Sequence, residues 1–238
     1  MKHITFYLDF ISPYAYLAFE QLPAALEGLS YSVSYRPILF AALLKHHGQL
    51  GPAEIPSKRD WTYRHVLWLA HRNVIAMQMP ESHPFNPLAL LRLATACGMT
   101  DGSRPGDAAG AGRVDGPLMA AAYEAVSVNR YVCESIFRHV WQGGAEAADP
   151  RRLETLYHQL DLQRRISPEQ AKQGLRTNTD HAISKGVFGV PAFEMDGMIF
   201  WGLDALPMLA DAMRGDAWFG GVEWNAMRTL PAGALRTR

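Results

Sequence analysis

Residues 6–18, FYLDFISPYAYLA, contain the change from strand to helix from which the rest of the fold can be inferred. Residues 5–10 are rich in β-branched and aromatic side chains, and residues 13–26 carry apolar side chains at helical spacing. Ser12 and Pro13 suit the start of that helix, because serine accepts a bond from a free backbone N–H and proline has none to leave unpaired. Ser12 is therefore a helix cap and, since helix N-termini stabilise anions, also a candidate partner for a thiolate.

The composition argues against several classes of function. The 238-residue chain has 23 Lys and Arg residues and 23 Asp and Glu residues, so its zero formal net charge favours neither nucleic acid nor an acidic membrane as partner. Asp9 interrupts the only apolar stretch near the N-terminus, which argues against a signal peptide. No apolar run reaches the roughly 18 residues of a transmembrane helix. We therefore expect a cytoplasmic protein.

Neither the cysteines nor the histidines have the spacing of a redox or metal site. Cys97 and Cys133 lie far apart in apolar helical contexts, where a small buried side chain is the expected role. Four histidines lack the i, i+4 spacing of a helical zinc pair, and we expect no metal there: His46, His47, His65 and His71.

The order of the predicted elements favours an α/β fold. Residues 31–38 predict a second strand that runs to Pro37, and strand, helix, strand is a βαβ unit with parallel strands. Strand patterns return only at residues 192–201, where Asp196 and Gly197 predict a hairpin turn. Further helices are predicted at 40–47, 59–76, 88–97, 118–128, 132–142, 151–160, 167–184 and 204–214, with irregular segments at 48–58, 79–87, 102–116 and from 216 onward.

This layout divides the chain into a core and an insertion. We predict a thioredoxin-like core of residues 1–58 and 176–215, an inserted helical subdomain of residues 59–175, and a C-terminal tail of residues 216–238.

Three motifs resemble one known family. Residues 9–18 (DFISPYAYLA), 186–193 (GVFGVPAF) and 200–204 (FWGLD) are similar to the 2-hydroxychromene-2-carboxylate isomerase family, which is related to kappa-class glutathione transferases and DsbA-like oxidoreductases. The resemblance implies a DsbA-like thioredoxin fold, glutathione as cofactor, a homodimer and a role in aromatic catabolism. The implied reaction is cis-trans isomerisation of an aromatic unsaturated 2-oxo acid by transient thiolate addition, which needs no metal.

The resemblance also implies roles for residues beside the cofactor's sulfur. DsbA-like proteins carry Cys-x-x-Cys where residues 12–15 here read SPYA, so no thiolate for disulfide exchange is present. In the family, the serine that matches Ser12 donates to the sulfur of glutathione. Val190 and Pro191 match the cis-proline of thioredoxin-like folds, which presents the backbone of Val190 to the cysteinyl part of glutathione. The alternative for Pro191 is a proline that enters an edge strand.

The ends of glutathione have candidate partners too. Asp204 matches the acid that holds the γ-glutamyl ammonium, with Leu203 beside the γ-glutamyl carboxylate, although relatives usually have a polar residue at position 203. Asp204 could instead cap the last helix. Gln49 and Lys58 align with contacts to the glycyl end; otherwise Lys58 is a solvated loop lysine.

The proline-rich segment supplies candidates for substrate contact. His83, Phe85 and Asn86 would face the cleft from the helical subdomain, while Asn86 alone could simply cap the helix that follows Pro87.

Two other functions remain open. A glutathione transferase or peroxidase would use the same thiolate but release a conjugate or oxidised glutathione. A thioredoxin-fold binding protein without cysteines would catalyse nothing, and glutathione affinity separates it from both enzymes.

Overall fold

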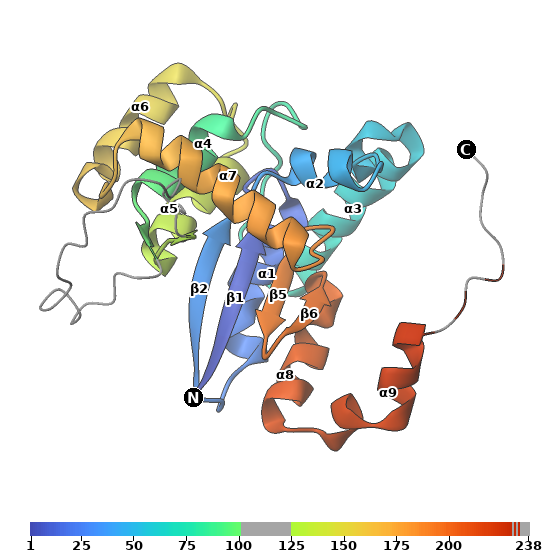
Figure 1. The fold of residues 1–238 in the computed structure, drawn as a ribbon. Coiled ribbons are helices and arrows are strands. Elements are labelled where there is room, and N and C mark those ends of the chain that lie inside the picture. The colour runs from blue at the N-terminus through green and yellow to red at the C-terminus, as the bar shows by residue number, and fades with distance from the viewer. Residues whose placement is uncertain (101–124, 230, 232, 234–238) are drawn as a thin grey trace, which may run out of the picture.

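A four-stranded mixed sheet lies at the centre of the computed structural model, which describes residues 1–100, 125–229, 231 and 233 (Figure 1). Its strand order is β2-β1-β5-β6. β1 (Lys2–Leu8) runs parallel to β2 (Tyr31–Pro37) and antiparallel to β5 (Ala192–Met195), which pairs antiparallel with β6 (Met198–Trp201). The predicted parallel βαβ unit and the later hairpin are both confirmed.

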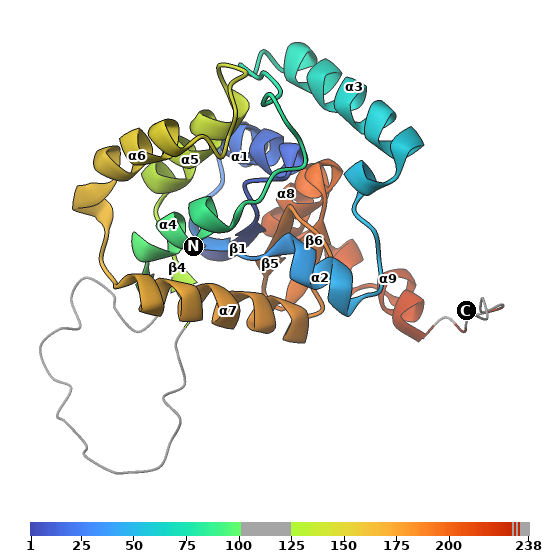
Figure 2. The same ribbon diagram turned by 90° about the horizontal axis from the view of Figure 1, so that it is seen from above.

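Helices cover both faces of this sheet (Figure 2). α1 (Pro13–Ala25) and α8 (Leu206–Arg214) lie on one face, and α2 (Phe40–His46) and α7 (Pro168–Ser184) lie on the other. Alternate side chains of β1 point to opposite faces, so Phe6 belongs to the larger core cluster and Tyr7 to the cluster under α7. Burial on both faces explains the continuous apolar pattern of this strand.

Two helices on opposite faces of the sheet begin with a serine cap, and the cap at Ser12 is the one that the sequence predicts. Ser12 caps α1, and Ser167 caps α7 in a capping box with Gln170. The hairpin turn has positive φ at Asp196 (51°) and Gly197 (77°), as a two-residue turn between twisted strands requires.

Between β2 and α7, the part of the chain that the structure describes contains four more α-helices. They are α3 (Pro56–Arg72), α4 (Leu88–Ala96), α5 (Arg130–Trp141) and α6 (Pro150–Gln159). α3 begins three residues earlier and ends four residues earlier than predicted, so Lys58 lies in its first turn rather than in a loop. The division of the chain into core, insertion and tail stays a prediction; its boundary after residue 175 falls inside α7.

The helix predicted over residues 118–128 is wrong where the structure describes it. Val126–Ser127 form strand β4, which pairs antiparallel with β3 (Met99–Thr100). The buried amide of Asn178 contacts both backbone groups of Val126, at 2.8 Å to N and 2.7 Å to O, and so holds the segment extended. Residues 118–124 and the predicted loop 102–116 lie outside the described residues.

The prediction of an irregular tail from residue 216 is also wrong for most of its described part. Short helical segments cover Ala217–Gly220 (η4), Val222–Ala226 (α9) and Met227–Thr229 (η5). The rings of Trp218, Phe219 and Trp224 pack together, and Phe219 contacts Phe200 of β6. Aromatic contacts with the sheet therefore order a segment whose local pattern is weak.

Within the described ranges, no helix is both long and apolar enough to span a membrane. Among the same residues, no cluster of three or more His, Cys, Asp or Glu side chains could hold a metal ion. Cys97 and Cys133 are both buried and unpaired by any disulfide, which confirms the expected role of small buried side chains.

Candidate functional site

Ser12 is almost buried at the N-terminus of α1, with 7% of its surface exposed. Its Oγ accepts a hydrogen bond from the backbone N–H of Ala15 (3.2 Å), which confirms the cap. The same hydroxyl donates to the carbonyl of Val190 across a long distance of 3.5 Å. Because a bond of this length is weak, the hydroxyl proton is free to turn to a closer acceptor.

Val190 and Pro191 face Ser12 and are joined by a cis peptide bond, as the resemblance implies. Pro191 directly precedes β5, a strand with partners on both sides, so the edge-strand interpretation is wrong. The carbonyl of Pro191 accepts from the N–H of Gly202 at 2.9 Å. The two C-terminal motifs thus form one wall of the site.

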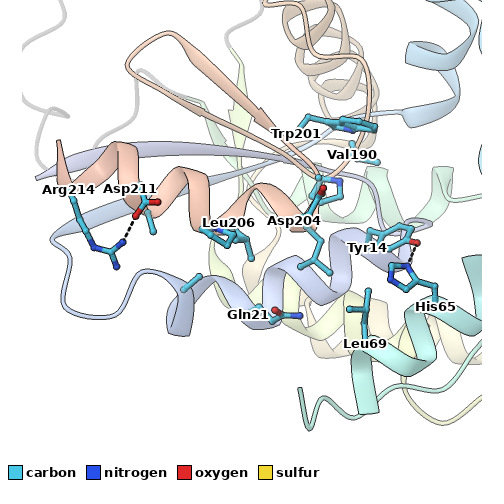
Figure 3. Close-up of a pocket in the computed structure, with 16 residues that line it drawn as sticks. Tyr14, Gln21, His65, Leu69, Val190, Trp201, Asp204, Leu206, Asp211 and Arg214 are labelled. Atoms are coloured by element: carbon cyan, nitrogen blue, oxygen red, sulfur yellow. Dashed lines mark hydrogen bonds and ion pairs between the residues drawn. The ribbon is translucent and has the colours of Figure 1, made fainter. Parts of the chain in front are cut away.

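A groove of about 790 Å³ runs from this wall between α1 and α8 (Figure 3). We call it the α1–α8 groove. Val190, Pro191, Leu203 and Asp204 line one end, where the exposed Trp201 also lies. Its other lining residues are Tyr14, Gln21, Ala25, His65, Leu69, Gly202, Leu206, Pro207, Ala210, Asp211 and Arg214.

Asp204 is exposed in the short 3₁₀ turn Leu203–Ala205 (η3) that precedes α8. The alternative role of a helix cap is wrong, because Ala205 occupies that position and no side chain caps the helix. A Cβ on Gly202 would lie 2.4 Å from Asp204 Oδ1, and Gly202 has a φ of +101°. Only glycine suits this position, so the Trp201-Gly202-Leu203-Asp204 order places the carboxylate at the groove.

Tyr14 stands beside Asp204, and its hydroxyl is 2.8 Å from Nδ1 of His65 (Figure 3). Burial, and secondly the negative charge of Asp204, raise the pKa of Tyr14, so its hydroxyl stays protonated near neutral pH. The sequence analysis did not select Tyr14, although it lies in the SPYA segment that replaces Cys-x-x-Cys.

A second space of about 240 Å³ lies on the other side of Tyr14 and Val190; we call it the Ser12 cavity. Its lining residues come from six segments of the chain and are mostly apolar. They are Asp9, Ile11, Ser12, Pro13, Tyr14, Phe40, Ala41, Leu44, Gly51, Pro52, Ala53, Glu54, Thr62, His83, Pro84, Phe85, Pro87 and Val190. Ser12 therefore lies where an apolar cavity adjoins a groove with charged side chains.

Asp9 is a residue of this cavity that the sequence analysis missed. Its carboxyl group is fully buried and accepts hydrogen bonds from the N–H groups of Ile11 (3.1 Å) and Phe40 (2.9 Å). Burial raises its pKa to about 7, against the lowering effect of these bonds. The available signal was an acidic residue at the end of a strand that is otherwise apolar, three positions before Ser12.

His83 also lines the cavity, with both ring nitrogens engaged. Nε2 lies 2.8 Å from the carbonyl of Ile11, and Nδ1 lies 2.7 Å from the hydroxyl of Tyr63. This network assigns the proton to Nε2. Burial lowers the pKa of His83, so the ring is neutral at neutral pH. Its role here is to hold the loop between β1 and α1 in place.

The other predicted site residues separate into two groups. Phe85 lines the cavity and Leu203 lines the groove. Gln49, Lys58 and Asn86 are exposed and line neither space. Asn86 accepts a hydrogen bond from the N–H of Leu88 at 3.0 Å, but it does not cap α4, because Pro87 occupies the cap position and no side chain caps the helix.

The chain has the features of a thioredoxin-like protein. They are this strand order, a helix N-terminus at the end of the first strand, and a cis-proline that faces that helix N-terminus. The chain belongs to the DSBA-like thioredoxin domain family, whose sequence model matches residues 3–111 and 110–214.

The curated relatives include proteins of both kinds that the three motifs resemble. Glutathione S-transferase kappa 1 of Rattus norvegicus is 25% identical over 231 residues, covering 91% of this chain and 92% of the relative. The 2-hydroxychromene-2-carboxylate isomerase of Pseudomonas sp. (strain C18) is 27% identical over 218 residues, covering 89% and 90%.

Among solved structures, a 2-hydroxychromene-2-carboxylate isomerase matches with a TM-score of 0.63 and 20% identity, covering 96% of this chain and all of that chain. At this identity the match establishes the fold alone.

Proposed function

We propose that the protein is a glutathione-dependent isomerase of the 2-hydroxychromene-2-carboxylate isomerase type, which changes the geometry of a double bond conjugated to a carbonyl group. The observation that carries this proposal is the position of Ser12, which lines the apolar Ser12 cavity and whose hydroxyl faces the carbonyl of Val190, a residue that lines both the cavity and the α1–α8 groove. The names of the relatives, kappa-class glutathione transferases and isomerases, support the same choice of cofactor and reaction class.

The residues present in the groove suit glutathione. Asp204 offers an exposed carboxylate for an ammonium group, and Val190, joined to Pro191 by the cis bond, offers its backbone to the cysteinyl part. The groove volume of about 790 Å³ leaves ample room for a tripeptide. When bound, glutathione would supply a thiolate that adds to the conjugated carbon and leaves after rotation about the resulting single bond. In our proposal the hydroxyl of Ser12 donates a hydrogen bond to the thiolate sulfur, and the N-terminus of α1 stabilises negative charge there.

The Ser12 cavity offers a mostly apolar space beside Ser12. Phe85 and Phe40 present rings to it, which suits an aromatic or other apolar substrate body. Tyr14 lines both spaces and keeps its proton near neutral pH, so its hydroxyl can donate to oxygen on a bound molecule. Gln49 and Lys58 as contacts to the glycyl end remain proposals, as do Leu203 beside the γ-glutamyl carboxylate and Asn86 beside the substrate.

Calorimetric titration of glutathione at neutral pH, with thiolate absorbance recorded in parallel, tests the proposal. We expect the wild type and Ser12→Ala both to bind, with thiolate formed only in the wild type. Ser12→Thr is the matched control, since it keeps the hydroxyl group. The cap lost in Ser12→Ala costs about 1 kcal/mol of stability, which unfolding measurements account for separately. No binding at millimolar glutathione would sink the cofactor hypothesis and leave a thioredoxin-fold binding protein.

Product analysis then separates the candidate enzymes. An isomerase returns glutathione unchanged, a kappa-like transferase releases a conjugate, and a peroxidase releases oxidised glutathione. A homodimer is the further expectation from the resemblance, and light scattering at micromolar concentration tests it. The cytoplasmic location stays an expectation from the composition.

A further inference from the structure

The charged groups that line the Ser12 cavity are all acidic. Asp9 and Glu54 contribute carboxyl groups, and none of the eighteen described lining residues is Lys or Arg. The histidine among them, His83, is neutral, because burial lowers its pKa against the raising effect of the contact between its Nε2 and the carbonyl of Ile11. Among the described residues, the cavity therefore has no side-chain cation to pair with an anionic ligand.

The nearest candidate cations are held elsewhere. Arg59 Nη2 donates to the carbonyl of His83 at 2.9 Å and its Nε donates to the hydroxyl of Tyr63 at 3.2 Å. Arg59 lines a neighbouring pocket, together with Glu54, and does not line the Ser12 cavity. Lys58, the residue expected to pair with a carboxylate, is exposed on the first turn of α3 and lines neither space.

A carboxylate on the substrate would meet a large penalty in such a place. An ion moved from water into an apolar space without an oppositely charged side chain beside it is strongly disfavoured. A second carboxyl group nearby adds repulsion and also favours the protonated form of Asp9, which is already fully buried. An uncharged carbonyl compound of the same shape avoids both costs.

The volume limits the size of the ligand as well. A cavity of about 150 Å³ suffices for benzene. The 240 Å³ of the Ser12 cavity therefore fits one aromatic ring with a short chain.

We infer that the Ser12 cavity selects an uncharged, single-ring or comparably small conjugated ketone or aldehyde, rather than the 2-oxo acid that the family resemblance implies, with Asp9 and Glu54 as the residues that disfavour a carboxylate. This inference rests on the proposed function for its reaction, but the charge preference can be measured without turnover.

Two compounds that differ in one group test the preference. (Z)-4-Phenylbut-3-en-2-one carries a methyl group where (Z)-benzylidenepyruvate carries a carboxylate on the same carbonyl carbon. Initial rates of conversion to the E isomers, at saturating glutathione, give kcat/KM for each. Each value is divided by the rate constant of the uncatalysed reaction with glutathione, which corrects for intrinsic reactivity. We expect the corrected value to be at least about tenfold higher for the methyl ketone, equivalent to 1.4 kcal/mol. Equal values, or a preference for the carboxylate, overturn the inference and leave the proposed function intact.

A cation placed in the cavity wall should reverse the preference. Leu44 lines the cavity from α2 and is half-buried, so Leu44→Arg brings a guanidinium to its edge. We expect the corrected ratio to move at least tenfold toward the carboxylate in Leu44→Arg, whereas the uncharged Leu44→Met keeps the wild-type preference. The same shift in both variants would show that packing, not charge, sets the ratio.

If the enzyme converts neither the methyl ketone nor the oxo acid, the binding of saturated analogues still tests the charge preference. 4-Phenylbutan-2-one and 2-oxo-4-phenylbutanoate have no double bond to attack, and their dissociation constants are measured by calorimetry in the presence of glutathione. Tighter binding of the ketone supports the charge preference even if the isomerase hypothesis fails. Tighter or equal binding of the oxo acid overturns it.

Discussion

The α1–α8 groove and the Ser12 cavity share Tyr14 and Val190 but differ in how they hold charge. The acid at the junction end of the groove, Asp204, is exposed, and Asp211 further along is paired with Arg214 at 2.8 Å. Of the two acids that line the cavity, Asp9 is completely buried and bonded to backbone N–H groups, while Glu54 is exposed. The groove therefore suits a charged ligand that keeps contact with water, and the cavity suits a ligand that leaves water.

The largest effect that this contrast predicts is a pH dependence of stability due to Asp9. Its pKa is about 7 in the folded protein and close to the ordinary value of 3.8 when unfolded, so the folded state binds a proton more tightly. Its contribution to stability is present at low pH and is lost as the pH rises from 4 to 7, by roughly 4 kcal/mol at most.

Urea unfolding of the wild type and Asp9→Asn at several pH values measures this. The Asn variant cannot ionise, so its stability relative to the wild type should increase steadily over that range. If the difference in unfolding free energy between the two proteins does not change with pH, the pKa of Asp9 is not raised by folding. The contrast between groove and cavity would then be lost.

The next effect concerns the groove. If Asp204 holds the glutathione ammonium, Asp204→Asn should weaken glutathione binding by roughly 10- to 100-fold, because hydrogen bonds to charged groups contribute about 1.5–3 kcal/mol. Asp211→Asn removes an acid from the same groove and serves as the matched control, with affinity close to that of the wild type. Calorimetry measures both, and equal losses in the two variants would indicate a general electrostatic effect instead of a specific contact.

A smaller effect should appear in the cavity alone. Phe85 is 9% exposed, and its ring lies 6.0 Å from that of His83, so Phe85→Leu removes aromatic contact area but keeps an apolar side chain. We expect KM for an aromatic substrate to rise several-fold, in line with about 1 kcal/mol of lost burial, while the dissociation constant of glutathione stays unchanged. A weaker glutathione affinity would show that the two spaces are coupled.

The last prediction, with the smallest expected signal, is that the protein's own two thiols, Cys97 and Cys133, do not react in the native state. Burial raises the pKa of Cys97 to about 11 and that of Cys133 well above its usual value. Neither thiol should react with an aromatic disulfide reagent in the native protein at neutral pH, and both should react after denaturation. Rapid reaction of the native protein would place a usable thiolate outside the groove.

Local patterns were sufficient to predict much of the fold. The cap at Ser12, the turn at Asp196 and Gly197, and the parallel pairing of the first two strands depend on neighbouring residues or on simple connection rules. The cis bond before Pro191 was predicted from the family resemblance. The residues alone did not distinguish a cis-proline from a proline that enters an edge strand.

Other features depend on residues far apart in the chain. Val126 is in a strand because Asn178, 52 positions later, holds its backbone. Residues 216–229 are ordered in part because Phe219 meets Phe200.

By itself, then, the sequence determined the α/β class, the position of Ser12 at a helix start, and the motif that carries Asp204, because each of these is encoded within a few consecutive residues. Only the tertiary structure decided that the surroundings of Ser12 divide into a groove and an apolar cavity, that Asp9 lies buried in the latter, and that Gln49, Lys58 and Asn86 line neither. The physical reason is that a cavity wall is assembled from segments distant in sequence, and burial, which sets both the pKa of Asp9 and the charge a ligand can carry, is a property of that assembly.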